Sequence, residues 1–481
     1  MIFSIKKMIY CLLLFPFVFL TSANNINVTN VSVVNVSGGA AEIQFDISWS
    51  NSWAFTEIVS GKNITNHDAA WVFIKFRSGA EWKHAWLSAT GHYAPTGARI
   101  DVASNGGDTN VGAFIYRSAD GFGGLSLSGV RLKWEFSKNG VLKTNNIDIS
   151  VQAIEMVYIP ECSFYIGSGG DENSHFYKYP NSTDPYYITN STAINIGQNT
   201  DELYYASGGG DHVGPIPSAF PNGYKAFYCM KYEITQGQYT KFLDYLPSGY
   251  DYQHYPNKYG QARHTINLVD GNFVVDTPDR ACNWLSWSDV CAYCDWAGLR
   301  PMTELEFEKA CRGSLFPIQK EYPWGDTTLT HLDYYDGVDG SGTETAFPTN
   351  ANCHSYYYHS TDTIRYGPAR AGIFARSGTT RHQAGAGYYG VMELGGNVYE
   401  QAVSVGYTQG RAFNGCHGDG YLQTLQPTWP TSTGSGKRGG SFTDHYSHNY
   451  DYRIRTSDRY SAAAVPLRES ISGGRGVRSA E

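Results

Sequence analysis

The sequence predicts an α+β protein in two parts: an all-β N-terminal sandwich, followed by a larger C-terminal domain with few regular elements. Residues 24 to 153 combine alternating apolar residues with short apolar runs, a pattern typical of strands. From residue 154 onward, capped helical patterns are separated by long stretches of Gly, Ser, Thr and Tyr. At 481 residues the chain is long enough for more than one domain.

The N-terminal strands are predicted from apolar periodicity. Residues 43 to 49 alternate Ile, Phe, Ile and Trp with polar residues, as in a half-buried strand. Residues 71 to 74 form a short apolar run typical of a central strand. Residues 130 to 136 alternate again, and Lys138-Asn139-Gly140 then predicts a hairpin into residues 147 to 151. Seven to nine such strands without a helix favour a sandwich.

Three helix starts can be recognised in the C-terminal region. Thr235 with Gln238, and Thr303 with Glu306, have the spacing of a capping box, in which side chain and backbone bind each other reciprocally. Ser286 precedes a third apolar pattern and is expected to cap that helix. Between these helices the chain shows little periodicity, which ordinarily counts against a compact domain.

Composition limits the partners. The net charge of -8, with 17% charged residues, argues against nucleic acid and anionic membranes. The chain has 37 Tyr and 11 Trp, which suit either a β-rich fold with half-buried rings or a binding surface. Lys83-His84, flanked by Trp82 and Trp86, are accordingly either ordinary strand residues or the lining of a ligand groove.

Residues 1 to 23 have the pattern of a secretory signal peptide. Two lysines precede an apolar run over residues 8 to 20, and Thr21-Ser22-Ala23 is a small-residue cleavage site. The apolar run is too short to span a bilayer comfortably. We therefore expect an exported protein that is secreted, at a cell surface or in a periplasm. Membrane association is expected only through a retained N-terminal segment.

Five segments of the C-terminal region occur in an order and spacing that identify a family. They are Met156-Val157-Tyr158-Ile159-Pro160, Tyr232-Glu233-Ile234-Thr235, Arg300-Pro301-Met302-Thr303-Glu304, Gly395-Gly396-Asn397-Val398-Tyr399-Glu400 and Arg438-Gly439-Gly440-Ser441-Phe442. Together they resemble the formylglycine-generating enzyme (sulfatase-modifying factor) family over residues 154 to 481. The resemblance implies an elaborated C-type-lectin-like fold with much ordered loop, which accounts for the missing periodicity.

The family's reaction depends on residues that this chain lacks. Family enzymes convert a sulfatase cysteine to formylglycine with oxygen and copper, and two cysteines just after Gly-Gly-Ser hold the copper. Here residues 443 to 452 contain no cysteine, and none follows Cys416. Soft Cu(I) selects thiolate ligands, so we expect no copper. Because these cysteines are missing, we expect a non-catalytic binding or structural protein.

Two other functions stay open at this stage. Asp444, His445 and His448 occupy the neighbourhood of the missing cysteines and could bind zinc or Cu(II), which would make the chain a metal-dependent oxidase. The same segment is rich in Tyr, His, Asn and Ser, a composition that resembles an antibody-like contact surface. It is also similar to the diversified loop of the variable proteins of diversity-generating retroelements.

A binding face would be formed by the end of this segment, for a protein or glycan ligand that the sequence does not identify. Its predicted contact residues are Tyr446, Asn449, Tyr450 and Tyr452, with Tyr399 and His417 as neighbours.

Calcium is the cofactor that the resemblance implies, in a structural role. The first family site corresponds to the side chains of Glu393 and Glu400 and the carbonyls of Gly396 and Val398. Glu393 is a departure, because family members usually have Asn or Asp there. The second site corresponds to Asn352, the carbonyls of Cys353 and Ile364, and Asp362. Hard cations such as calcium prefer clustered oxygen ligands of these kinds.

Eight cysteines remain after the predicted signal peptide. Cys294 and Cys311 correspond to structural cysteines of animal family members, whose usual partners near the C-terminus are absent here. The two are therefore expected to be either free and buried or paired differently.

Overall fold

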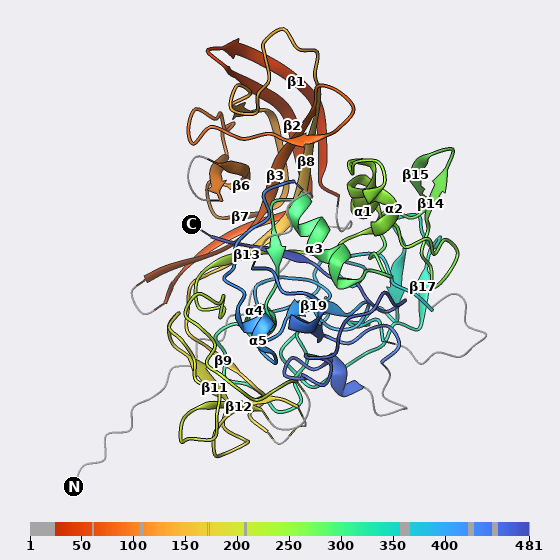
Figure 1. Ribbon diagram of the computed structural model, residues 1–481. Coiled ribbons are helices and arrows are strands. Elements are labelled where there is room, and N and C mark those ends of the chain that lie inside the picture. The colour runs from red at the N-terminus through yellow and green to blue at the C-terminus, as the bar shows by residue number, and fades with distance from the viewer. Residues whose placement is uncertain are drawn as a thin grey trace.

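The structure is a computed structural model that describes residues 25–59, 62–105, 109–170, 172, 174–205, 209–355, 366–421, 428–444 and 451–480. An elongated N-terminal region of strands stands on a rounder C-terminal region in which loops predominate (Figure 1). The architecture is mostly β with few helices, as the sequence predicts. No helix in the described parts of the chain is long and apolar enough to cross a membrane.

The described part of the N-terminal region contains strands and no helix. The strands are β1 (Asn27–Ser37), β2 (Ala40–Val59), β3 (Lys62–Arg77), β4 (Lys83–His84), β5 (Ala98–Ser104), β6 (Asn110–Arg117), β7 (Gly121–Trp134) and β8 (Asp148–Ile159). Strand β2 pairs antiparallel with β1, β3 and β7, and β6 joins β3 to β5.

The predicted alternation in β2 is confirmed by burial. Ile43, Phe45 and Ile47 are at most 1% exposed, whereas the polar residues between them are half-buried. These side chains pack on Val72 and Ile74 of β3 in the core of the N-terminal region. Period-two burial of this kind places one face of the strand on the core and the other toward solvent.

The predicted hairpin between residues 130–136 and 147–151 is wrong. The turn at Lys138 to Gly140 is present, but β7 pairs with β2 and β8 pairs with β3. Strand β3 offers β8 a continuous antiparallel register from Arg77↔Asp148 to Asp68↔Val157. This long-range pairing competes successfully with the local turn signal, which specifies a reversal of the chain and not the neighbouring strand.

Strand β8 belongs to both regions. Its first ten residues pair with β3, and its end, Met156–Ile159, also pairs with β13 (Phe227–Met230). One sheet therefore runs β1-β2-β3-β8-β13-β21-β16, from the N-terminal region into the C-terminal region. The predicted boundary between residues 153 and 154 falls inside this shared strand.

The C-terminal region has short elements joined by long ordered loops. Its other strands are β9 (Phe164–Ile166), β10 (Phe176–Lys178), β11 (Tyr186–Ile188), β12 (Leu203–Tyr205), β14 (Ile266–Val269), β15 (Asn272–Val275), β16 (Arg300–Pro301), β17 (Tyr334–Asp336), β18 (Thr345–Phe347), β19 (Glu400–Val403), β20 (Ser435–Arg438) and β21 (Gly476–Ser479). Its helices are α1 (Gln236–Asp244), α2 (Tyr250–His254), α3 (Trp287–Trp296), α4 (Glu304–Arg312), α5 (Thr408–Arg411), and the 3-10 turns η1 (Ser432–Gly434) and η3 (Asp451–Ile454).

The three predicted helix starts are confirmed. Thr235, Ser286 and Thr303 are the N-caps of α1, α3 and α4, and each completes a capping box with the third helical residue. Such caps satisfy backbone N–H groups that have no partner inside the helix. Helices α3 and α4 are buried along nearly all their length, so they form part of the core.

Candidate functional site

A buried acidic cluster lies beside the Gly-Gly-Asn turn. Glu233 follows β13, Glu393 precedes the turn, and Glu400 begins β19. All three carboxylates are at most 3% exposed. The turn requires Gly396, which has a φ of 80° and whose added Cβ would lie 2.6 Å from the Cys353 sulfur. The turn thus brings Glu393 and Glu400 to one place.

Arg475 is the cation of the acidic cluster. Its Nε donates to Glu400 Oε1 at 2.6 Å, and its terminal nitrogens donate to the carbonyls of Met230, Lys231 and Glu393 at 3.2 to 3.3 Å. The guanidinium is fully buried. Arg475 is thus in direct contact with the cluster, and Arg370 also acts on Glu393 by lowering its pKa.

Glu233 fixes the turn. Its carboxylate accepts from the Asn397 side-chain amide and, at 3.1 Å, from the Val398 backbone N–H. Glu393 Oε1 accepts from the Gly372 backbone N–H at 2.7 Å. Glu233 was not among the predicted site residues, although it lies in the quoted Tyr232-Glu233-Ile234-Thr235 segment.

Two carboxylate oxygens of the cluster are buried without a hydrogen-bond partner among the described residues: Glu393 Oε2 and Glu400 Oε2. Burial raises the pKa of Glu393 to about 7, and the neighbouring Glu400 contributes in the same direction. Burial also raises the pKa of Glu233, again with help from Glu400. The three carboxylates thus outnumber the two guanidinium groups, Arg475 and Arg370, that act on them.

The donor types present are those that the predicted calcium ion would use. Unpartnered carboxylate oxygens from Glu393 and Glu400 are hard ligands of the kind that calcium prefers. Within the described parts of the chain no three His, Cys, Asp or Glu side chains converge as a metal cluster. Calcium here would therefore use two carboxylates together with the carbonyls of Gly396 and Val398, and the site stays a prediction.

The second predicted calcium site can be followed only in part. Asn352 is buried, and its Oδ1 accepts from the Thr330 backbone N–H at 2.9 Å. The Cys353 carbonyl accepts from the Leu332 N–H at 3.0 Å. Asp362 and Ile364 lie outside the described residues. Both described oxygens of this site, Asn352 Oδ1 and the Cys353 carbonyl, therefore accept hydrogen bonds from the backbone.

Asp444 lies just after the Gly-Gly-Ser segment, and its carboxylate is hydrogen-bonded to neighbouring protein groups. Its Oδ2 accepts from the Ser441 backbone N–H at 2.9 Å and from the Ser441 hydroxyl at 3.0 Å. Its Oδ1 accepts from Arg453 at 3.2 Å. The side chain is 3% exposed, and burial raises its pKa. His445 and His448, the other two residues of the alternative metal site, lie outside the described residues.

The predicted binding face is described at one of its four residues. Tyr446, Asn449 and Tyr450 lie outside the described residues. Tyr452 is half-buried, with its ring edge-on to Tyr460 at a centroid distance of 6.1 Å.

The two predicted neighbours of that face occupy different environments. Tyr399 is 2% exposed and lies beside Asp444, whose charge adds to the effect of burial in raising the Tyr399 pKa. Its side chain is thus an interior one and not a contact surface. His417 is half-buried and accepts from the Ser479 backbone N–H at 3.0 Å, which places it against β21.

All eight cysteines of the described chain are free, and six are buried. Cys294 and Cys311 are among the buried ones, so the first of the two predicted alternatives is confirmed. Burial raises the pKa of both thiols above the range of an ordinary cysteine. Thiols held protonated in this way are poor nucleophiles and poor metal ligands.

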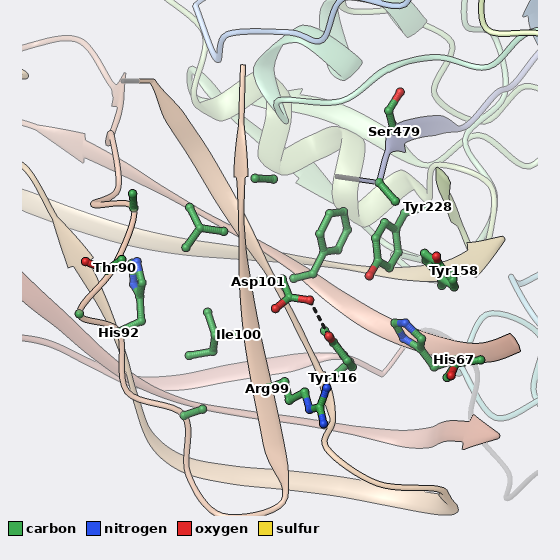
Figure 2. A pocket seen from close by; sticks show the side chains of 18 residues that line it. His67, Thr90, His92, Arg99, Ile100, Asp101, Tyr116, Tyr158, Tyr228 and Ser479 are labelled. Carbon is green, nitrogen blue, oxygen red and sulfur yellow. Dashed lines mark hydrogen bonds between the residues drawn. The ribbon is translucent and has the colours of Figure 1, made fainter. Parts of the chain in front are cut away.

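Two cavities lie on the N-terminal side of the molecule. The smaller, of about 360 Å³, is lined by Trp82, Lys83 and Trp86, so these residues of the predicted groove do border a cavity. His84 is instead fully buried and hydrogen-bonded to the Lys75 side chain. The larger, of about 770 Å³, lies where the two regions meet and is drawn in Figure 2. No sequence pattern predicts this cavity, because its walls come from segments far apart in the chain.

The shared sheet, the capped helices and the loop-rich domain around the Gly-Gly-Asn turn define a protein with a domain of the formylglycine-generating type. Residues 150–480 match the family model described as the sulfatase-modifying factor enzyme 1-like domain. This match covers more than half of the chain, and the chain belongs to that family.

Three relatives illustrate the similarity. The formylglycine-generating enzyme of Thermomonospora curvata is 31% identical over 186 residues, which is 38% of this chain and 52% of the relative. The Mus musculus formylglycine-generating enzyme is 29% identical over 170 residues, 35% of this chain and 37% of the relative. The inactive Cα-formylglycine-generating enzyme 2 of Mus musculus is 26% identical over 185 residues, 36% and 48% respectively. The chain spans about half or less of the length of each.

Proposed function

We propose that this chain is an exported, non-catalytic binding or structural protein built on a sulfatase-modifying-factor domain. The observation that carries the proposal is Asp444. Both of its carboxylate oxygens are engaged by Ser441 and Arg453, where the family resemblance places copper-binding cysteines. A buried carboxylate with its hydrogen bonds satisfied maintains a local fold, and offers no soft ligand for Cu(I).

The cysteines support the same proposal. No cysteine follows Cys416 in the sequence. Cys353 is fully buried near Asp444, and burial, with the Asp444 charge, raises the pKa of its thiol to about 12. A thiol protonated at neutral pH does not supply the thiolate that copper chemistry of this family requires.

The names of the relatives include both enzymes and an inactive protein. Two of the three are named as formylglycine-generating enzymes, and the third is named as an inactive one. The same scaffold therefore occurs in proteins named for the reaction and in a protein named as lacking it. The Asp444 neighbourhood favours the second kind for this chain.

Calcium is proposed as a structural ion of this scaffold. The support is the pair of unpartnered oxygens on Glu393 and Glu400, which lie around a turn that joins two distant parts of the domain. An ion between them would neutralise buried negative charge and hold the turn closed. Such a role is independent of any reaction.

The proposed function is tested by metal analysis and by a direct assay. The purified chain is examined by elemental mass spectrometry before and after chelator, and is incubated with copper, oxygen and a cysteine-containing sulfatase peptide. We expect no stoichiometric copper, iron or zinc and no formylglycine aldehyde in the peptide. Aldehyde formation would establish the metal-dependent oxidase instead, and stoichiometric copper, iron or zinc that is lost in His445→Ala would contradict the metal-free segment after Gly-Gly-Ser.

A further inference from the structure

The larger cavity is an open cleft at the junction of the two regions. Its walls come from the loop before β5, from β5 itself, from β3 and β6, and from β8, β13 and the end of β21. Figure 2 shows Tyr228, Tyr158 and His67 at one end of the cleft, Thr90 and His92 at the other, and Asp101 between them. Its volume of about 770 Å³ lies within the usual range of small-molecule sites, roughly 300 to 1,000 Å³.

One end of the cleft is a rigid stack of aromatic rings. The His67 ring lies between Tyr116 and Tyr158, with centroid distances of 4.4 and 4.9 Å and nearly parallel planes. Tyr228 is stacked on Phe114 at 3.6 Å. The ring faces are thus largely used within the protein. What remains for a ligand is the polar edge of each ring.

Two of those polar edges belong to His67 and Tyr228, which both line the cleft. His67 Nδ1 lies 3.0 Å from the Asp68 carbonyl, which can only accept, so Nδ1 carries the proton and Nε2 is an acceptor. Neither His67 Nε2 nor the Tyr228 hydroxyl has a hydrogen-bond partner among the residues that the structure describes. Yet the two side chains are only 6% and 5% exposed. Both residues line the cleft, so a ligand there can supply hydrogen bonds that the described residues do not make.

The two groups complement each other. The His67 and Tyr228 rings are 5.8 Å apart, one offering an acceptor and the other a hydroxyl donor. A ligand hydroxyl both donates and accepts, and can satisfy the two at once. A carboxylate or phosphate would bind only the Tyr228 donor, and an ammonium group would bind only the His67 acceptor.

The charges of the cleft balance. Among the described lining residues the charged side chains are Arg99 and Asp101, one of each sign. Burial lowers the pKa of both His67 and His92, so the two histidines are neutral at physiological pH. The Asp101 carboxylate accepts from the Tyr116 hydroxyl and keeps further acceptor capacity. A balanced lining rich in hydroxyls favours an uncharged polyhydroxyl ligand over an ionic one.

We propose that this cleft binds a neutral oligosaccharide, with His67, Tyr228 and Asp101 as the residues that bind its hydroxyl groups. At the buried end, the His67 acceptor and the Tyr228 donor bind one ligand hydroxyl. Along the open side, Asp101 and Arg99 bind further hydroxyl groups. The inference goes beyond the proposed function, because it uses neither the Asp444 segment nor calcium. An experiment that contradicts one of the two proposals therefore leaves the other standing.

The test uses the purified full chain on an array of neutral and acidic oligosaccharides, followed by titration calorimetry with the neutral oligosaccharide bound best. Tyr228→Phe removes one hydroxyl that has no partner in the described protein, so folding is preserved. We expect this variant to bind about three- to tenfold more weakly, and Asp101→Asn to bind at least tenfold more weakly. Melting temperatures should stay unchanged.

The matched control is Tyr187→Phe. Tyr187 is 46% exposed, lies outside the cleft, and its hydroxyl also has no partner among the described residues. This variant should bind like the unmodified chain. The proposal is overturned if no neutral oligosaccharide binds, if acidic ones bind in preference, or if Tyr228→Phe and Asp101→Asn leave affinity unchanged.

Discussion

Arg475 donates to a single oxygen of Glu400, and the other oxygen of that carboxylate is left buried without a partner in the described chain. The pair joins the strand β19 to the segment that leads into β21, so it ties the central turn to the shared sheet. Because both side chains are almost completely buried, neither charge can be compensated by water if its partner is removed.

Arg475→Met should therefore be strongly destabilising. Loss of one partner of a buried ion pair leaves an uncompensated charge and costs about 3 to 5 kcal/mol. The measurement is the free energy of unfolding from urea denaturation. Arg77→Met is the matched control, because the Arg77–Asp148 pair is exposed and should contribute less than about 1 kcal/mol. Equal effects in the two variants would contradict the role given to Arg475.

Calcium should stabilise the protein through Glu393. At a calcium concentration about one hundred times the dissociation constant, the expected gain is about 2.7 kcal/mol, and a chelator should remove it. Glu393→Gln keeps an oxygen to accept from Gly372 but removes one negative charge, and leaves the Arg475–Glu400 pair intact. Thermal melts of this variant should no longer respond to calcium. A response equal to that of the unmodified chain would place the ion elsewhere.

Lys75 should make stability rise with pH. Burial lowers its pKa to about 7, although Asp295 and Asp419 act in the opposite direction. Between pH 7 and about 10 the unfolded chain keeps a proton that the folded chain has released, so raising the pH favours the folded state. The slope contributed by this group is at most about 1.4 kcal/mol per pH unit.

The Lys75 effect is measured as the difference between urea denaturation at pH 7 and at pH 9. Lys75→Met should lack the contribution, whereas Lys83→Met, which alters an exposed lysine on the neighbouring strand, should retain it. If Lys75→Met and the unmodified chain show the same pH slope, Lys75 is charged in the folded protein.

Asp444→Ala should destabilise the segment after Gly-Gly-Ser without changing metal content. The substitution leaves the buried Ser441 N–H without its acceptor, which costs about 1 to 3 kcal/mol. Asp444→Asn, which retains an acceptor oxygen, should cost less. Elemental analysis beside the denaturation curves checks the second half of the prediction. Loss of a stoichiometric metal in either variant would make Asp444 a ligand.

The elements that sequence predicts correctly are those governed by local rules. The capping boxes at Thr235 and Thr303 depend on residues three positions apart, and the alternation in β2 depends on residues two positions apart. The hairpin after β7 is predicted from an equally local signal, but β8 pairs with the distant strand β3 and not with β7. Strand partners are decided by which edges are available in the finished sheet.

The candidate site shows the same limit. Glu393 and Glu400 were found because they flank one recognisable turn, whereas Glu233 and Arg475 reach it from positions more than 70 residues away in the chain. The cleft was not foreseen at all, since His67, Asp101 and Tyr228 carry no spacing signal and meet only in the folded protein.

The shared strand β8 also limits how this protein can be divided. Domains joined by a flexible linker can be exchanged, truncated or pulled apart with little damage to either. Here a cut near residue 153 would split a strand that is hydrogen-bonded to β3 on one side and to β13 on the other. Each fragment would then present an unpaired, apolar edge, the type of surface that promotes aggregation. The two regions should accordingly melt in a single cooperative transition.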